Sequence, residues 1–296
     1  MQENRSGCFF LNTVYTNELM CKVHRMFGAD RFVFYNYSTG SNVTAHLRRY
    51  AAEGIVSTVM PWRVPVAVDV WPPDPKEEAE IHYFAQLAAL NDCLYRVMFR
   101  ARFAVVVDLD EVAVPRRRSR WRPMLEDATA RWRRRFVSVD GVKTADDIFP
   151  GAYLMQNVFF RTNWQDDDRV ANDTRVRRFD LLTLMKTRRE DRPYPHYARS
   201  KYIAWTRSAA MLAVHNVQEF VDDSRVRHVL VDEHDALLHH YRQWDGDSLR
   251  LGSNRPTIDR RMHDFYADII ARAAQRHRRA THRATRRQDV IARRDA

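Results

Sequence analysis

The chain has 296 residues, of which 45% are hydrophobic and 29% charged, a balance that excludes a wholly disordered protein and allows a large core. Lysine and arginine number 49 against 38 acidic residues, for a formal net charge of +11. No stretch approaches the roughly eighteen uninterrupted apolar residues of a membrane helix. The basic residues are spread along the chain, which is not typical of nucleic-acid binding.

The first sixty residues alternate between predicted strands and predicted helices. Apolar runs predict strands at Cys8–Tyr15, Arg31–Asn36 and Ile55–Met60. Asn17 and Ser41 are the predicted N-cap residues of two helices, which are expected to end at Gly28 and Gly54. This alternation is typical of an α/β protein with a parallel, doubly wound sheet.

A proline-rich loop at residues 61–76 is followed by a helix predicted from Glu80 to Arg100. Its apolar stripe is expected to consist of Ile81, Phe84, Leu87, Ala88, Leu94, Tyr95 and Met98. Asn91 falls within that stripe, where a buried amide needs a hydrogen-bond partner. Two interpretations stay open: Asn91 satisfies a backbone group while Asp92 pairs with Arg96, or these polar residues line a ligand pocket.

The strongest candidate site is the sequence VVVDLDEVAVP, from Val105 to Pro115. Its β-branched run predicts a strand buried on both faces, which ends at Asp108, Asp110 and Glu111. Ligands of open α/β sheets bind beyond the carboxyl ends of the strands. Two aspartates at this spacing can share a Mg²⁺ or Mn²⁺ ion that also binds phosphates, and the alternative is a solvated acidic turn.

The second half of the chain is less regular. A helix is predicted at Trp121–Arg135, with a solvated basic side, and a short helix at Glu233–Tyr241. Strands are predicted at Phe136–Val139, Tyr153–Phe160, Arg199–Thr206 and Ala209–Val214. From about Ala271 onward, the Arg- and Ala-rich sequence predicts a marginal helix or a disordered tail.

Cysteines and glycosylation sequons bear on the compartment. Cys8, Cys21 and Cys93 match no metal-ligand spacing, and three buried thiols are expected rather than one pair with one left over. Four N-glycosylation sequons, at Asn4, Asn36, Asn42 and Asn172, favour the secretory pathway.

The segment HYFAQLAALNDCLYRVMFRARFAVVVDLDEVAVP, from His82 to Pro115, resembles the signature of glycosyltransferase family 92. Shorter matches follow in the family's order: Glu18, FVFYNYST at Phe32–Thr39, RSKYI at Arg199–Ile203, His215, and HYR at His240–Arg242. The likeness spans about Gly7 to Tyr241. Val112 and Trp205 depart from it, because the family has an aromatic residue and a proline near these positions.

The resemblance implies a GT-A fold, which is a Rossmann-like mixed sheet flanked by helices, and metal-dependent transfer from a UDP-sugar to a glycan acceptor. Asp108 and Asp110 would hold Mn²⁺ or Mg²⁺, with His215 as the third ligand and His240 as second choice. Lys201 would neutralise phosphate charge. Asn36, Gln86, Asn91 and Asp92 would line the donor pocket.

The family is expected to invert configuration and to transfer galactose, so a carboxylate should deprotonate the acceptor hydroxyl. The candidates for this base are Asp166, Asp167, Glu219 and Asp222, and the sequence does not choose among them. Glu111 is expected to be structural, with its side chain pointing away from the two aspartates.

The resemblance also implies an organisation and a location. A glycosyltransferase domain is expected at residues 7–245 and an Arg-rich C-terminal tail at residues 246–296. Family members are usually Golgi membrane proteins with a luminal catalytic domain. This chain lacks an anchoring helix, and we expect a fragment or a shortened gene product. The expected partners are a UDP-sugar and a glycan, with no nucleic acid.

Two rival classes compete with the transferase. The first is a haloacid-dehalogenase-like phosphatase with Asp108 as nucleophile and Asp110 as acid, for which Lys143, Asp146 and Asp147 are a faint motif. The second is a non-enzyme that binds anionic glycans or nucleic acid through its arginines, for example a catalytically inactive glycan-binding relative. Its binding would be salt-sensitive and would survive the substitution Asp108→Ala.

Overall fold

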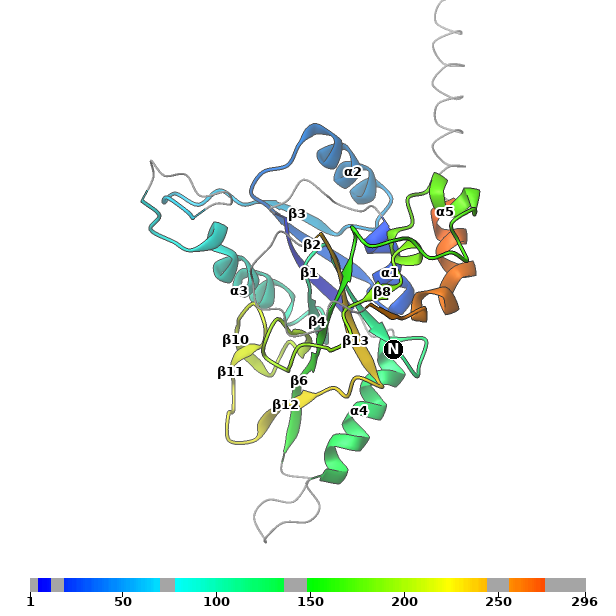
Figure 1. The fold of residues 1–296 in the computed structure, drawn as a ribbon. Coiled ribbons are helices and arrows are strands. Elements are labelled where there is room, and N and C mark those ends of the chain that lie inside the picture. The colour runs from blue at the N-terminus through cyan, green and yellow to red at the C-terminus, as the bar shows by residue number, and fades with distance from the viewer. Residues whose placement is uncertain (1–4, 12–18, 70–77, 136–147, 244–255, 275–296) are drawn as a thin grey trace, which may run out of the picture.

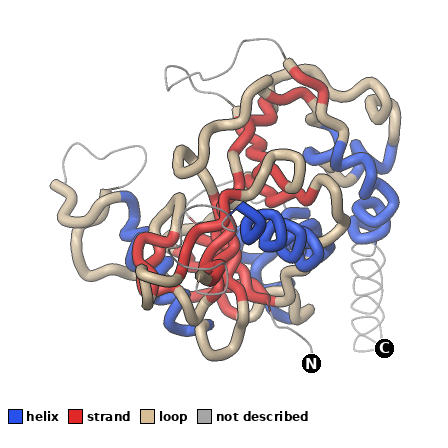
Figure 2. Tube along the Cα trace, turned by 90° about the horizontal axis from the view of Figure 1, so that it is seen from below, coloured by secondary structure: helices blue, strands red, loops and turns tan. Residues whose placement is uncertain are grey.

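A computed structural model describes residues 5–11, 19–69, 78–135, 148–243 and 256–274, with side chains from Cys21 onward (Figure 1). The predicted strand Phe136–Val139 lies outside these residues, as do Asn17, Glu18, Lys143, Asp146 and Asp147. Figure 2 shows the strands gathered in the interior, with helices around them.

A seven-stranded mixed sheet forms the centre of the molecule, in the order β12-β6-β9-β4-β1-β2-β3. Its strands are β1 (Arg5–Leu11), β2 (Arg31–Asn36), β3 (Thr58–Pro61), β4 (Phe103–Val106), β6 (Phe149–Met155), β9 (Lys201–Trp205) and β12 (Val226–Leu230). β1 runs parallel to both β2 and β4, and β2 runs parallel to β3, as the alternation of strands and helices predicts. The whole sheet is mixed, as the resemblance implies, because β9 runs antiparallel to both β4 and β6.

A second sheet of five strands has the order β14-β8-β7-β13-β5. Its strands are β5 (Glu111–Pro115), β7 (Asn157–Arg161), β8 (Arg188–Arg189), β13 (Ala236–Arg242) and β14 (Thr257–Ile258). The predicted helix Glu233–Tyr241 is therefore wrong. Periodicity alone cannot distinguish a short apolar run in a buried strand from one in a helix, and β13 is buried between β5 and β7.

The helices are α1 (Leu19–Phe27), α2 (Ser41–Ala52), α3 (Gln86–Val97), α4 (Trp121–Arg135), α5 (Thr174–Arg178) and α6 (Leu182–Met185), with 3-10 turns at Tyr83–Ala85 and Arg261–Phe265. Residues 266–274 are also helical. The strands β10 (Ala209–Leu212) and β11 (Val217–Phe220) form a separate antiparallel hairpin.

Alternate residues of the central strands face two different apolar layers. Val105 faces a layer that includes α1, α2, α4 and the five-stranded sheet. Val106 and Tyr202 face the other layer, where α3 and the β10–β11 hairpin pack. Figure 1 shows this arrangement, with α3 and the hairpin on one side of β4 and β6 and with α1 and α4 on the other.

Helix α3 begins later, and buries a different face, than predicted. Tyr83, Phe84 and Ala85 have left-handed backbone conformations, so the α-helix begins only at Gln86. The buried residues of α3 are Gln86, Ala89, Leu90, Cys93, Leu94 and Val97. Leu87 and Tyr95 of the expected stripe are 52% and 58% exposed. Cys93 is disulfide-bonded and Cys21 is a buried free thiol, which corrects the expectation of three thiols.

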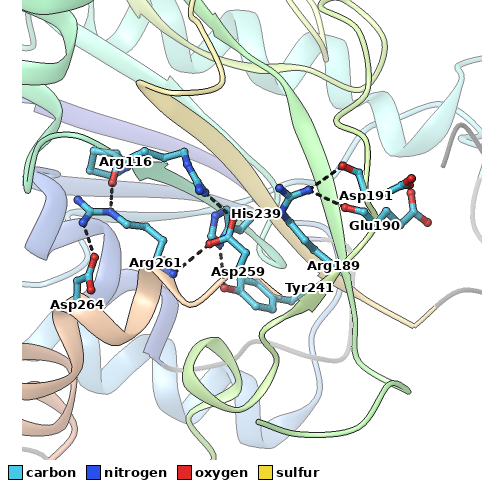
Figure 3. Close-up of polar contacts among 10 residues, drawn as sticks. Arg116, Arg189, Glu190, Asp191, His239, Tyr241, Asp259, Arg261 and Asp264 are labelled. Carbon is cyan, nitrogen blue, oxygen red and sulfur yellow. Dashed lines mark hydrogen bonds and ion pairs between the residues drawn. The ribbon is translucent and has the colours of Figure 1, made fainter. Parts of the chain in front are cut away.

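The core extends beyond the expected domain end at residue 245. Met262, Phe265 and Ile269 are almost completely buried and belong to the same apolar cluster as Phe27 of α1. Figure 3 shows a polar anchor for this segment, in which Asp259 accepts from Arg116 at 2.5 Å and from Arg189 at 3.1 Å. At least residues 257–274 are therefore part of the folded domain rather than of a tail.

Candidate active site

The acidic motif lies where the chain passes from one sheet to the other. β4, between β1 and β9, ends at Val106, and β5 begins at Glu111 in the five-stranded sheet. The intervening turn is closed by a hydrogen bond from the Glu111 backbone N–H to the Asp108 carbonyl, at 3.2 Å. Because a different sheet holds each end of the turn, Asp108 and Asp110 have rigid support.

Glu111 is the buried centre of the site. Its Oε2 accepts a hydrogen bond from the Asp108 backbone N–H at 2.8 Å and lies 3.9 Å from Lys201 Nζ. Its Oε1 lies 3.3 Å from His240 Nδ1 and accepts from Asn157 Nδ2 at 3.4 Å. Burial raises the pKa of Glu111 to about 7, although the charge of Lys201 opposes this shift. Glu111 thus ties the acidic turn to strands β7, β9 and β13.

Asp108 and Asp110 lie next to this buried cluster around Glu111 and face solvent. Lys201 Nζ is 3.0 Å from Asp108 Oδ1, and His240 Nε2 is 3.2 Å from Asp110 Oδ2. The side chains of Asp108 and Asp110 are 43% and 39% exposed, whereas those of Lys201 and His240 are 1% and 7% exposed. Each aspartate therefore has a buried cationic or hydrogen-bonding partner below it and an open side above.

Burial and ion pairing shift the pKa values of the site residues in opposite directions. Burial disfavours the charged form of Asp110, but the neighbouring His240 outweighs it and lowers the Asp110 pKa. Burial likewise disfavours the charged forms of Lys201 and His240, yet the acidic residues raise the pKa of both. The ion pairs therefore favour the charged forms of Asp110, Lys201 and His240.

His215 lies at the tip of the β10–β11 hairpin, next to this cluster. Its Nδ1 is 3.1 Å from the backbone carbonyl of Ser200, the residue before Lys201, so Nδ1 carries the proton. Burial, followed by the charge of Lys201, lowers the His215 pKa and keeps the ring neutral. No hydrogen bond among the described residues involves Nε2, whose lone pair is available to a ligand.

These donor groups suit a hard divalent cation. Within the described ranges, no three His, Cys, Asp or Glu side chains are already grouped as a metal site. The open carboxylates of Asp108 and Asp110 and the Nε2 of His215 are nevertheless donor types that Mn²⁺ and Mg²⁺ accept. A neutral imidazole whose other nitrogen binds a backbone carbonyl is the usual form of a metal-ligating histidine. His240 is less suitable, because both of its nitrogens already have partners.

The predicted donor-binding residues differ in how far their polar atoms are already used. Both polar atoms of Asn91 bind backbone groups, namely Leu87 O and Leu212 O and N, at 2.8 to 3.0 Å. Asp92 accepts from Arg96 at 2.6 Å and from Tyr35 at 2.5 Å. These contacts favour the structural interpretation of Asn91 and Asp92.

Asn36 and Gln86 use fewer of their polar atoms in hydrogen bonds within the described residues. Asn36 lies at the carboxyl end of β2, where its Nδ2 donates to Thr39 at 3.1 Å. Its Oδ1 is buried and has no hydrogen-bond partner among the described residues. Gln86 is buried at the first turn of α3.

The four candidate bases lie on three different elements. Asp167 is buried and accepts from Thr187, the Arg169 backbone and Arg260, so its carboxylate is fully used. Asp166 pairs with Lys186 at 2.6 Å, and Asp222 caps its own turn through Ser224. Glu219 is exposed on β11, the hairpin strand that follows His215.

Sequence reasoning missed the supporting role of Asn157 and Ser200 and the central position of Glu111. Asn157 is fully buried, and its Nδ2 reaches His240 at 3.1 Å as well as Glu111. A polar pair, Gln156 and Asn157, within the apolar run Tyr153–Phe160 was the available signal. It marks the point where the chain changes sheets, since β6 ends at Met155 and β7 begins at Asn157.

The mixed sheets and flanking helices, with an acidic turn at the carboxyl end of β4, are compatible with a glycosyltransferase fold. Comparison with known protein families matches residues 19–270 to Glycosyltransferase family 92. The chain therefore belongs to this family, which implies glycosyltransferase activity. A comparison with curated proteins found no match. No helix in the described part of the chain is long and apolar enough to cross a membrane.

Proposed function

We propose that the protein is a metal-dependent, inverting glycosyltransferase of the GT-A fold, which transfers a hexose from a UDP-sugar to a glycan. The hexose that we propose is galactose. The observation that carries this proposal is the pair of open carboxylates, Asp108 and Asp110. A buried cluster of Glu111, Lys201 and His240 holds this pair in place. Family membership gives the reaction class, and the pair supplies a place for the diphosphate's metal.

Each residue then has a definite task. Asp108, Asp110 and His215 would hold Mn²⁺ or Mg²⁺, which supplies Lewis-acid stabilisation of the departing diphosphate. Lys201 is too buried to contact the donor freely, so its task is to position Asp108. Asn36, at the carboxyl end of β2, would contact the uridine or the ribose. Gln86 would line the same pocket.

For the base that deprotonates the acceptor hydroxyl, we propose Glu219. Of the four candidates, it alone lies on the hairpin that carries His215 at its tip, and its carboxylate is exposed. Asp167 cannot serve, because three donors already occupy it.

The disulfide bond of Cys93 supports a place in the oxidising secretory pathway, where we propose that the domain acts on luminal glycans.

The test is transfer and UDP-sugar hydrolysis with a panel of donors, with and without Mn²⁺. We expect Mn²⁺-dependent turnover that Asp110→Asn reduces by at least about 100-fold. Glu126→Gln, which removes the same charge from the exposed surface of α4, should leave turnover unchanged. Glu219→Gln should lower kcat by about 100-fold or more while donor binding persists.

Full turnover by Asp110→Asn, or equal turnover in the presence of EDTA, would contradict the metal site. A phosphorylated Asp108 trapped from a phosphate ester would instead support the phosphatase.

A further inference from the structure

A cavity, called here the hollow, lies away from the acidic turn, between the last turns of α4 and strand β12. Its volume is about 340 Å³. Small-molecule sites in proteins run from about 300 to 1,000 Å³, so this hollow can hold one or two sugar-sized units. Nothing in the proposed transferase mechanism uses its residues.

One part of the hollow is apolar and aromatic. Trp132 of α4 lines it together with Tyr197 and Leu230, and the last two are 48% and 42% exposed. Flat aromatic faces pack well against the C–H faces of sugar rings. Tyr197 is held in place, because its ring packs edge-on against His228 and its backbone N–H donates to Ser200 Oγ at 2.9 Å.

The rim of the hollow is basic. Arg131, Arg135 and Arg227 line it, and a neighbouring hollow that shares Arg131 is lined by Arg117, Arg118 and Arg134. The carboxylates of the two hollows are Asp127, Asp232 and Asp235, so six arginines face three aspartates.

Two of those aspartates are already neutralised. Asp235 is paired with both Arg131 and Arg117, and Asp127 is paired with Arg118. Arg227 donates hydrogen bonds to backbone carbonyls, which do not neutralise its positive charge. Arg135 is exposed at the end of α4 and has no acidic partner among the described residues. The field in the hollow therefore favours an anion.

We propose that this hollow binds an anionic saccharide, a sugar unit that carries a carboxylate or a sulfate. An aromatic face next to arginines matches a ring with an apolar side and an acidic substituent, which guanidinium groups bind through paired hydrogen bonds. A neutral sugar would leave the arginines unused. A purely ionic ligand would leave Trp132 and Tyr197 unused.

The hollow is linked to the active site through one short segment. Tyr197 is four residues before Lys201, which pairs with Asp108, and Ser200 contacts both Tyr197 and His215. If the transferase function proposed above holds, the anionic unit belongs to the acceptor glycan.

The experiment measures binding of three disaccharides to the full chain by calorimetry, without UDP-sugar or added metal. The probes are digalacturonic acid, a sulfated heparin disaccharide and neutral lactose. We expect one or both acidic probes to bind and lactose not to bind. Arg135→Glu should weaken binding of the acidic probe by at least about tenfold. Arg133→Glu is the matched control, since Arg133 is exposed on the same helical turn but lines neither hollow.

Equal weakening by Arg133→Glu and Arg135→Glu would overturn the proposal, because it would mean diffuse attraction to a basic surface. Binding of lactose as tight as that of the acidic probes would also overturn it, as would failure of both acidic probes to bind. Preference between the two acidic probes identifies the carboxylate or the sulfate as the recognised group.

The two proposals can fail separately. Binding that depends on Arg135 in a protein without transferase activity would leave the hollow in place and remove its link to an acceptor. Transferase activity without such binding would support the transferase function and rule out the saccharide site in the hollow.

Discussion

Single residues in this protein show how one buried carboxylate can organise a site. Glu111 contacts the Asp108 backbone, Lys201, His240 and Asn157, and each comes from a different strand or turn. The identity of the exposed pair, Asp108 and Asp110, could be predicted from the sequence because both follow a β-branched run directly. The buried cluster that supports this pair could not be predicted, since only the packing of the two sheets brings its residues together.

Lys201 provides the first prediction. Lys201→Met leaves His240 as the remaining basic neighbour of buried Glu111, and loss of one partner of a buried pair costs about 3 kcal/mol of unfolding free energy. The double variant Lys201→Met with Glu111→Gln removes both charges and should recover at least half of that loss. Urea denaturation of the wild type, both single variants and the double variant forms the cycle. Additive losses would mean that the two side chains do not interact.

Asn91 provides the second prediction. Its amide satisfies the backbone N–H and C=O of Leu212, which holds the β10–β11 hairpin against α3. Asn91→Ala should therefore lower the unfolding free energy by about 2 kcal/mol, because it leaves buried backbone groups unpaired. Donor affinity, measured by titration with UDP, should change less than about twofold if the role is structural. A large loss of UDP affinity with unchanged stability would restore Asn91 to the donor pocket.

At the scale of elements, several expected boundaries were confirmed and others moved for identifiable reasons. The strand Arg31–Asn36 and the helix Trp121–Arg135 lie where the sequence pattern places them. The strand before the acidic motif ends close to where it is expected, and β5, which begins at Glu111, is not predicted. The run Tyr153–Phe160 is expected as one strand, but it supplies the end of β6 to one sheet and most of β7 to the other. The polar pair Gln156 and Asn157 is the local sign of this turn, but the apolar residues on both sides of it also fit one continuous buried strand.

The contact between β6 and its neighbours gives the third prediction. A Cβ at Gly151 would lie 2.3 Å from Val226 Cγ1 and 2.4 Å from Phe220 Cε1. Gly151→Ala should thus lower the unfolding free energy by about 2 kcal/mol through overpacking. Gly40→Ala is the control, since nothing lies within 4 Å of a Cβ there and Gly40 has a negative φ. Gly40, rather than Ser41 as predicted, is the N-cap of α2, so this variant should lose no more than about 1 kcal/mol. Equal melting temperatures for the two variants would show that β6 can shift without cost.

At the scale of the whole molecule, the C-terminal segment closes the domain. It joins β5, β8 and β13 through the anchor around Asp259, and its apolar residues complete the core beside α1. His239 lies in the same place, completely buried and stacked on Phe160 at 4.2 Å. The alternation of β13 directs His239 to this anchor and His240 to the active site.

Burial of His239 predicts how stability depends on pH. Desolvation lowers its pKa from 6.5 to about 3, although the charge of Asp259 opposes the shift and the three nearby arginines, Arg116, Arg189 and Arg261, support it. The unfolded chain binds a proton near pH 6.5 and the folded chain does not, so stability is lost as pH falls from 6.5 toward 3. Relative to His239→Phe, the wild type should lose about 2 kcal/mol between pH 7 and pH 5. Parallel pH profiles of denaturant unfolding would contradict this account.

The amino-acid sequence by itself determined the alternation of strands and helices in the first half, the position of the acidic pair, and the family. These follow from local periodicity and from short motifs, which neighbouring residues alone create. Only the tertiary structure decided that β9 runs antiparallel, that Ala236–Arg242 is a strand, and that Glu111, Lys201 and His240 share one buried site. The physical reason is that pairing partners and burial depend on which distant segments meet, and a local pattern carries no record of them.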